Sequence, residues 1–290
     1  MTQATLLFGL GATKAGTSWL YRYLEAHPEC HLRAIKELHY FDALEAGRLH
    51  RARDEIDRAR AALAARPVPA DRVRAEARAR RLKDMADWSA ALARGDEAAY
   101  LDYLGAGRGE RRLVADITPA YALLPAARLR LMAAMASDVR FVYLLRDPVA
   151  RLWSHVRMIA HRRAAPGEAL GPRARRILAR VLKGGEAHIA ARGDYRAVLS
   201  RLWDAIDPSR LFLGFYEELF SQSAVDRLCG FLGVGPRAAA LQVRVHAGPD
   251  LSMTAVQRAA AAAWLAPQYD FVAERLGRLP AEWQSQRVGV

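Results

Sequence analysis

Cysteine is scarce in this chain of 290 residues, which contains only Cys30 and Cys229. Two cysteines so far apart cannot form the disulfide framework of a small secreted protein, and they follow no spacing typical of metal ligands. The dispersed histidines, His155 among them, also form no ligand pattern with cysteines or carboxylates. We therefore expect a reducing, cytoplasmic environment and no bound metal.

Long hydrophobic runs are also missing. No stretch approaches about 18 continuous apolar residues, so we expect no transmembrane helix. The first residues lack the basic start and extended apolar stretch of a signal peptide. Apolar residues nevertheless make up 52% of the chain, which is enough for a sizeable core. The length suits one α/β domain over residues 1–290.

Negative charge is the scarcer sign, with 31 acidic against 44 basic residues and a net charge of +13. A positive surface attracts anions of many kinds, including nucleic acid, nucleotides and acidic glycans. The basic stretches at 72–83 and 173–180 lack interleaved aromatic residues, so we expect no nucleic-acid partner. The excess is mostly arginine in an alanine-rich chain, and genome composition explains it equally well.

Strand and helix patterns alternate along the chain. Apolar runs at 5–10, 112–118, 139–147 and 209–219 predict strands, and helical periodicity is found at 17–26, 125–137, 148–161, 193–206 and 223–234. Residues 46–109 predict a helical insertion of two or three helices broken at Pro67 and Pro69. Residues 161–176 predict a basic loop. The residues from about 250 to 290 predict a C-terminal helical segment. This alternation predicts a P-loop-type parallel sheet flanked by helices on both faces.

A glycine loop joins the first predicted strand to the first predicted helix. Its sequence, GATKAGTS, has the glycine spacing of a Walker A loop, but Thr17 stands at the lysine position and Lys14 lies inside the loop. A strand, loop and helix in this order direct backbone N–H groups and the positive helix end at an anion. We therefore predict an anion cradle, to which Thr17 and Ser18 add hydroxyl donors.

A second anion site is predicted at the end of FVYLLRD. Arg146 is the first polar residue after this strand, and Asp147 lies only behind it. A nucleotide-triphosphate site would need a carboxylate here to help hold magnesium. The arginine instead indicates a nucleotide pocket with two anion-binding ends and no metal.

These segments resemble those of sulfotransferases that use 3′-phosphoadenosine 5′-phosphosulfate (PAPS). GATKAGTSWLY is similar to the family's 5′-phosphosulfate loop, and FVYLLRDPVARLWSHVRM is similar to its 3′-phosphate motif. KELHYFD resembles the segment that carries the catalytic glutamate in the carbohydrate and heparan-type branch. DITPAYALLP and residues 193–220 also match in the expected order. The resemblance covers most of residues 6–234 and is weak at 46–109 and over the last fifty residues.

The resemblance implies that PAPS is the co-substrate and that the acceptor bears a hydroxyl, which we expect on a glycan or glycolipid. The nucleotide-binding residues that it implies are Thr13, Lys14, Ala15, Gly16, Thr17, Ser18, Trp19, Arg146 and Ser154. Trp19 would stack on adenine or, about equally, pack in the core. Lys36 and Tyr121 are expected beside the acceptor. A solvated position explains Lys36 equally well. Tyr121, and Asp116 as another candidate for the acceptor cleft, are explained as well by burial at the sheet edge.

Sulfuryl transfer needs a base for the acceptor's proton and a cation for the oxygen left on the phosphate. Lys14 suits the second role, because a cation helps most where negative charge develops. Glu37 is the expected base, and His39 is the alternative. A structural pair between Glu37 and Lys36, and a core position for His39, are the other interpretations.

Two features depart from the family pattern. Ile117 stands where the heparan-type branch often has lysine, and no late Arg/Lys-Gly loop is found, so Arg244 or His246 is a candidate substitute. Two other function classes remain open. A P-loop kinase would need magnesium, and a basic binding module without catalysis would show strong salt dependence and tolerate Glu37→Gln.

Overall fold

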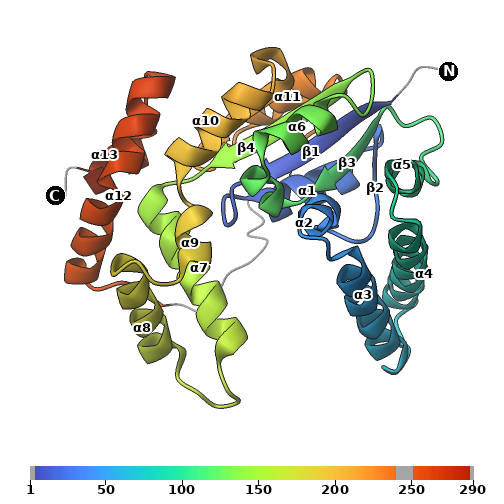
Figure 1. Cartoon of the computed structure of the whole chain (residues 1–290), viewed down its shortest axis with the longest axis horizontal. Helices are drawn as coiled ribbons and strands as arrows, with labels where there is room; N and C mark the ends of the chain where they lie inside the picture. The colour runs from blue at the N-terminus through green and yellow to red at the C-terminus, as the bar shows by residue number, and fades with distance from the viewer. Residues whose placement is uncertain (1–3, 240–250, 288–290) are drawn as a thin grey trace.

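A single parallel sheet forms the centre of the computed structural model, which describes residues 4–239 and 251–287 (Figure 1). The strand order is β2-β3-β1-β4-β5, and every pairing is parallel. β1 is central, with Thr5 opposite Leu113 on one side and Leu6 opposite Val139 on the other. The strands are β1 (Thr5–Gly11), β2 (Cys30–Leu32), β3 (Leu113–Ile117), β4 (Val139–Leu145) and β5 (Leu211–Phe215). The predicted fold class is confirmed.

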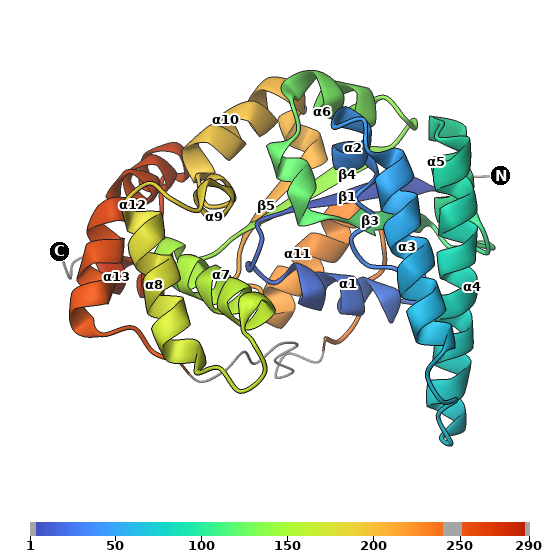
Figure 2. The ribbon, with the colours of Figure 1, turned by 60° about the horizontal axis from the view of Figure 1, so that its bottom comes forward.

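Helices cover both faces of the sheet. α1 (Thr17–Glu25) and α11 (Gln222–Leu232) lie on one face, and α6 (Ala126–Ala133) and α10 (Tyr195–Ala205) lie on the other (Figures 1 and 2). β1 is buried along its whole length, as a strand covered on both faces must be. Short 3₁₀ turns, η1 (Pro119–Leu123) and η2 (Pro208–Arg210), complete the connections.

The predicted insertion at 46–109 contains three helices. They are α3 (Leu49–Ala64), α4 (Arg72–Arg94) and α5 (Glu97–Gly105), and the short α2 (Tyr40–Glu45) precedes them. α3 and α4 form a helical arm that extends away from the sheet (Figure 2). No residue of α3 is buried, and the buried residues of α4 lie in its second half, where Trp88 packs against α5. Most of the arm is therefore a solvated layer.

On the opposite side of the sheet lie α7 (Pro148–Arg163), α8 (Leu170–Leu182), α9 (Ala187–Ala191), α12 (Ala255–Leu276) and α13 (Ala281–Arg287) (Figure 1). The prediction of a loop over 161–176 was correct only for residues 164–169, because α7 continues to Arg163 and α8 already begins at Leu170. Its buried residues include Ile177 and Val181, and the helix packs against α7. Pro172 stands in the first turn of α8, where proline is tolerated. Among the described residues, no helix is long and apolar enough to cross a membrane.

Candidate active site

The predicted site segments leave the sheet at one edge. The glycine loop follows β1, Arg146 follows β4, and the segment that contains Glu37 follows β2. Because all five strands are parallel, their carboxyl ends meet at this edge, which is where open α/β sheets bind ligands. The topology therefore brings together residues that are more than a hundred positions apart in the sequence.

Gly16 shapes the loop at the start of α1. Its φ is 94°, a left-handed conformation, and a Cβ at this position would lie 2.9 Å from the Tyr216 ring. Glycine is therefore required both by the backbone and by the close ring. No side chain caps the start of α1, although the Trp19 N–H donates to the Gly16 carbonyl at 2.9 Å. The helix therefore directs its Thr17 and Ser18 N–H groups at an anion.

Arg146 reaches from the end of β4 to the glycine loop. Its Nη1 donates a hydrogen bond to the Lys14 carbonyl at 3.0 Å, and its guanidinium carbon lies 4.5 Å from the centre of the Tyr216 ring. The Tyr195 hydroxyl accepts the backbone N–H of Arg146 at 3.0 Å and donates to its carbonyl at 2.6 Å. Arg146 is thus fixed at its backbone and in contact with the loop.

Lys14 lies in a strongly positive region. Burial lowers the pKa of Lys14, and the charges of Arg146, Arg157 and Arg162 lower it further, whereas the charge of Glu37 raises it. Three arginines and one carboxylate therefore act on the same ammonium group. This excess of positive charge fits a phosphosulfate or phosphate group and opposes a metal cation.

The other predicted nucleotide-binding residues differ in exposure. Thr13, Ser18 and Ser154 are partly exposed, and Ala15 and Thr17 are buried. Trp19 is also buried: its ring stacks on Tyr23 with centroids 5.4 Å apart and meets Phe220 edge-on. The structure therefore places Trp19 in the core, which was the second interpretation of this residue.

Glu37 lies between two basic side chains. Its carboxylate forms an ion pair with Lys36, and its Oε2 lies 3.7 Å from His39 Nε2. The opposite nitrogen of His39, Nδ1, lies 2.9 Å from Asp42 Oδ2. The Glu37 side chain keeps 40% of its exposure, so an acceptor can reach it. The structure brings the predicted base, its alternative and Lys36 together.

Charge separates the roles of the two candidate bases. Asp42 and then Glu37 raise the pKa of His39 to about 10, although burial opposes this. Burial alone would raise the pKa of Glu37, but His39 and Lys36 outweigh it and lower that pKa to about 2. At neutral pH Glu37 is therefore ionised and His39 carries a proton, so only Glu37 can accept one.

Unusual backbone conformations gather at the same place. Four non-glycine residues within 4–239 and 251–287 have a positive φ, namely Lys14, Glu37, His39 and Glu186. Such conformations cost about 1–3 kcal/mol each and cluster at functional sites. Three of the four are the residues that the sequence predicts to be catalytic.

A model of the "Sulfotransferase family" matches residues 7–235, most of the chain. The chain belongs to the sulfotransferase family. This supports sulfuryl transfer as the general reaction. No curated protein sequence matches the chain significantly.

One solved sulfotransferase structure shares the fold, and two further sulfotransferase domains match the chain with lower scores. A sulfotransferase from Alicyclobacillus acidocaldarius matches with 22% identity and a TM-score of 0.64, covering 98% of this chain and 100% of that one. The sulfotransferase domain of a Synechococcus olefin synthase matches with 17% identity, 96% and 95% coverage and a TM-score of 0.43. The sulfotransferase domain from the curacin biosynthetic pathway matches with 18% identity, 90% and 83% coverage and a TM-score of 0.47.

Tyr121 of this sulfotransferase does not face the solvent. Its fully buried hydroxyl accepts the Tyr40 backbone N–H at 3.0 Å and donates to Asp116 Oδ2 at 2.8 Å. Asp116 also accepts hydrogen bonds from Tyr100 and Thr118. Burial, the other interpretation of Tyr121 and Asp116, describes both residues. Tyr121 holds the first residue of α2, three positions after Glu37, and does not line an acceptor surface.

Several residues of the site were not predicted. Tyr216 and Glu217 follow β5 at the same edge as Arg146, and the Glu217 carboxylate accepts the Asp147 backbone N–H at 2.8 Å. Their position at the end of a parallel strand was the signal that could have found them. Arg157 follows Ser154 by three positions on α7, which was a second signal, whereas Arg162 lies in the segment that the sequence predicted to be a loop.

Two further predictions concern the late loop and a metal centre. Arg244 and His246, the candidate substitutes for the late loop, lie outside the described residues. For a metal centre, no group of three histidine, cysteine or carboxylate side chains is found in the part of the chain that the structure describes.

Proposed function

We propose that this sulfotransferase moves the sulfuryl group of PAPS to an acceptor hydroxyl, on a glycan or glycolipid. The observation that carries the proposal is the contact between Arg146 and the glycine loop at the Lys14 carbonyl, which brings the two predicted anion-binding segments together. The charges of Arg157 and Arg162 add to the positive field that acts on Lys14. PAPS carries a phosphosulfate and a ribose 3′-phosphate, and both need positive partners. The positive-φ backbone at Lys14 and Glu37 supports the same location.

The residues that would hold PAPS come from two segments. Backbone N–H groups around Gly16, the Lys14 ammonium and the Ser18 hydroxyl would bind the phosphosulfate. Arg146 and Ser154 would bind the 3′-phosphate, since a guanidinium can donate to two oxygens at once. When bound, PAPS supplies the sulfuryl group that the reaction transfers.

Three side chains would then act on the reaction. Glu37 takes the proton of the acceptor hydroxyl, because it is ionised and partly exposed. Lys14 stabilises the charge on the oxygen that remains with the phosphate. Protonated His39, fixed by Asp42, holds the Glu37 carboxylate in place together with Lys36.

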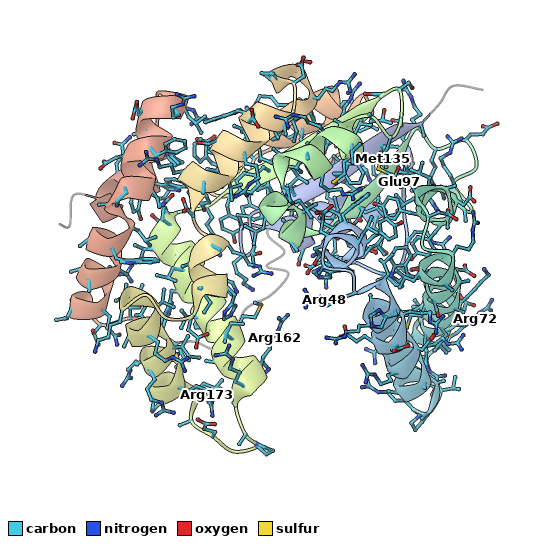
Figure 3. All side chains as sticks on the ribbon, viewed as in Figure 1. Arg48, Arg72, Glu97, Met135, Arg162 and Arg173 are labelled. Carbon is cyan, nitrogen blue, oxygen red and sulfur yellow. The ribbon has the colours of Figure 1, made fainter. Side chains whose placement is uncertain are left out.

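Arginine side chains stand at the approach to the site. Arg162, on the last turn of α7, and Arg48, just before α3, lie on facing sides of the space between these helices (Figure 3). Both are exposed. An acceptor that enters between them meets hydrogen-bond donors and positive charge, which favours a polar molecule such as a glycan over an apolar alcohol.

Calorimetric titration with adenosine 3′,5′-bisphosphate, the nucleotide product, tests the proposal. We expect binding that is equal with and without magnesium, because no step requires the metal. Arg146→Ala should abolish most of this binding. Arg130→Ala is the matched control, since Arg130 is exposed on α6 and pairs with Asp204. Binding that requires magnesium would favour the kinase alternative, and absence of binding would contradict the proposal.

A further inference from the structure

The last two helices are packed against the nucleotide end of the site. α12 and α13 lie beyond residues 7–235, the range that the family model matches. α12 packs against α7 and α10, on the side of the sheet away from the helical arm (Figure 1). These helices therefore contact the elements that carry Ser154 and Tyr195.

Tyr269 of α12 reaches the residue that follows Arg146. Its buried hydroxyl donates to Asp147 Oδ2 at 2.5 Å. The other oxygen, Oδ1, accepts the Ala150 N–H at 2.7 Å and so caps the start of α7. The Asp147 backbone N–H is held by Glu217. Asp147 is thus fixed at three atoms, one of them by α12.

Trp283 of α13 packs between Tyr269 and Tyr195, the tyrosine whose hydroxyl holds the Arg146 backbone. The indole is fully buried and stacks on the Tyr195 ring, with centroids 6.2 Å apart and an interplanar angle of 14°. It also meets the Tyr269 ring edge-on at 5.9 Å. One tryptophan therefore contacts both tyrosines whose hydroxyls hold Arg146 and Asp147.

We propose that Tyr269 is a positioning residue for the 3′-phosphate end of the nucleotide site. Acting through Asp147, it fixes the end of β4, from which Arg146 extends, and the start of α7, which carries Ser154. Without the Tyr269 hydroxyl, the Asp147 carboxylate, only 4% exposed, loses a donor and shifts toward another partner. Arg146 and Ser154 would then move relative to each other. The inference rests on the proposed function, because it assigns a partner to the same nucleotide.

A comparison of two nucleotides separates positioning from general support of the fold. Adenosine 3′,5′-bisphosphate carries the 3′-phosphate, and adenosine 5′-monophosphate lacks it. In Tyr269→Phe we expect the dissociation constant of the bisphosphate to rise about tenfold, because one hydrogen bond to a charged group is lost. The monophosphate should bind as it does to the unmodified protein. Equal weakening of both nucleotides, or of neither, would overturn the inference.

Tyr103→Phe is the matched control. The Tyr103 hydroxyl donates to the buried carboxylate of Asp84 at 3.0 Å, far from Arg146 in the insertion. This variant removes a similar hydrogen bond and should bind both nucleotides normally. If the unmodified protein shows no preference for the bisphosphate, the proposed function fails. If Arg146→Ala removes that preference but Tyr269→Phe keeps it, only the present inference fails.

Hydrogen–deuterium exchange gives a second measurement that needs no variant. Coupling between sites is reciprocal, so a nucleotide that gains affinity from α12 must also stabilise α12. We expect the bisphosphate to slow exchange in peptides from 255–287 more than the monophosphate does. Equal protection by the two nucleotides would contradict a link between these helices and the 3′-phosphate.

Discussion

Lys36, Glu37, His39 and Asp42 form a short alternating row of charges. His39 interacts with a carboxylate on each side, which explains why its pKa is raised to about 10. Glu37 in turn interacts with a cation on each side. Their protonation states support Glu37 over His39 as the proposed base, where the sequence left two candidates. The row also makes the ionised form of Glu37 available over a wide pH range.

Replacement of Glu37 by glutamine should reduce kcat and leave nucleotide affinity nearly unchanged. Loss of a positioned general base typically costs about 100-fold to 10,000-fold in rate. Turnover measured with labelled PAPS and an acceptor, together with the dissociation constant of the bisphosphate, checks this. Glu45→Gln is the control, because Glu45 pairs with Arg128 at 2.6 Å. Full turnover in Glu37→Gln would remove Glu37 as the base.

The stability difference between the unmodified protein and His39→Gln should depend on pH. The folded-state pKa of His39 is raised from 6.5 to about 10. The stabilisation that protonated His39 adds to the folded state is therefore complete below pH 6.5 and is lost as the pH rises from 6.5 to about 10. Thermal unfolding of both proteins across this interval measures the change. His50→Gln, exposed on α3, serves as the control. A difference that stays constant with pH would contradict the assignment.

The connection between β2 and α2 is the element that presents the base. A fully buried hydrogen-bond network lies behind it, in which Asp116 accepts from Tyr100, Thr118 and Tyr121. Tyr121 also accepts the first backbone N–H of α2. Tyr40 and Phe41, at the start of this helix, pack on the Tyr100 ring. β3, η1 and α5 therefore hold the Glu37 segment from inside the molecule.

Removal of the Tyr121 hydroxyl should weaken this support. Tyr121→Phe leaves the Tyr40 N–H without its acceptor and Asp116 with one donor fewer, which should cost about 1–3 kcal/mol of unfolding free energy. We also expect kcat to fall more than nucleotide affinity, because α2 starts near Glu37. Urea unfolding and turnover measure both effects. Tyr143→Phe should cost less, since the buried Tyr143 hydroxyl has no hydrogen-bond partner within the described chain.

The sequence predicted the long elements and the residues at their ends. β1, β4 and α7 were found because their apolar patterns are continuous, and Lys14 and Arg146 follow two of these strands. β2 was missed because three residues, Cys30–Leu32, are too short for a pattern. α8 was missed because proline and glycine near its start are typical of loops.

The supporting contacts could not be predicted in the same way. Tyr269 is separated from Asp147 by 122 positions, and Trp283 has no motif around it. Aromatic residues in a helix pattern predict burial, but the pattern does not specify which hydroxyl meets which carboxylate. The burial of Trp19 could not be predicted either, because it involves Phe220, which only the fold brings near.

Across the whole molecule, positive charge exceeds negative charge by 13. Part of this excess surrounds Lys14, and the exposed arginines of α7 and the helical arm add to it. The field of such a distribution attracts an anionic nucleotide before any specific contact forms. Salt screens this attraction, since the Debye length is about 8 Å at physiological ionic strength.

Affinity for adenosine 3′,5′-bisphosphate should therefore fall several-fold between low and physiological salt, mainly through slower association. Stopped-flow or surface-based kinetics at several salt concentrations would measure this. Uncharged adenosine is the control ligand, and its weaker binding should change little. If the salt dependence of the two ligands is the same, long-range attraction does not contribute to nucleotide capture.

The central position of β1 also has a consequence for synthesis on the ribosome. β1 is made first, yet its partners contain Leu113 and Val139. At about 5–20 residues per second, the strand waits several seconds for β3 and longer for β4. During this time both of its edges are unpaired and its side chains are apolar. A nascent chain that ends before β4 therefore exposes an aggregation-prone strand, and the anion loop forms only after this interval.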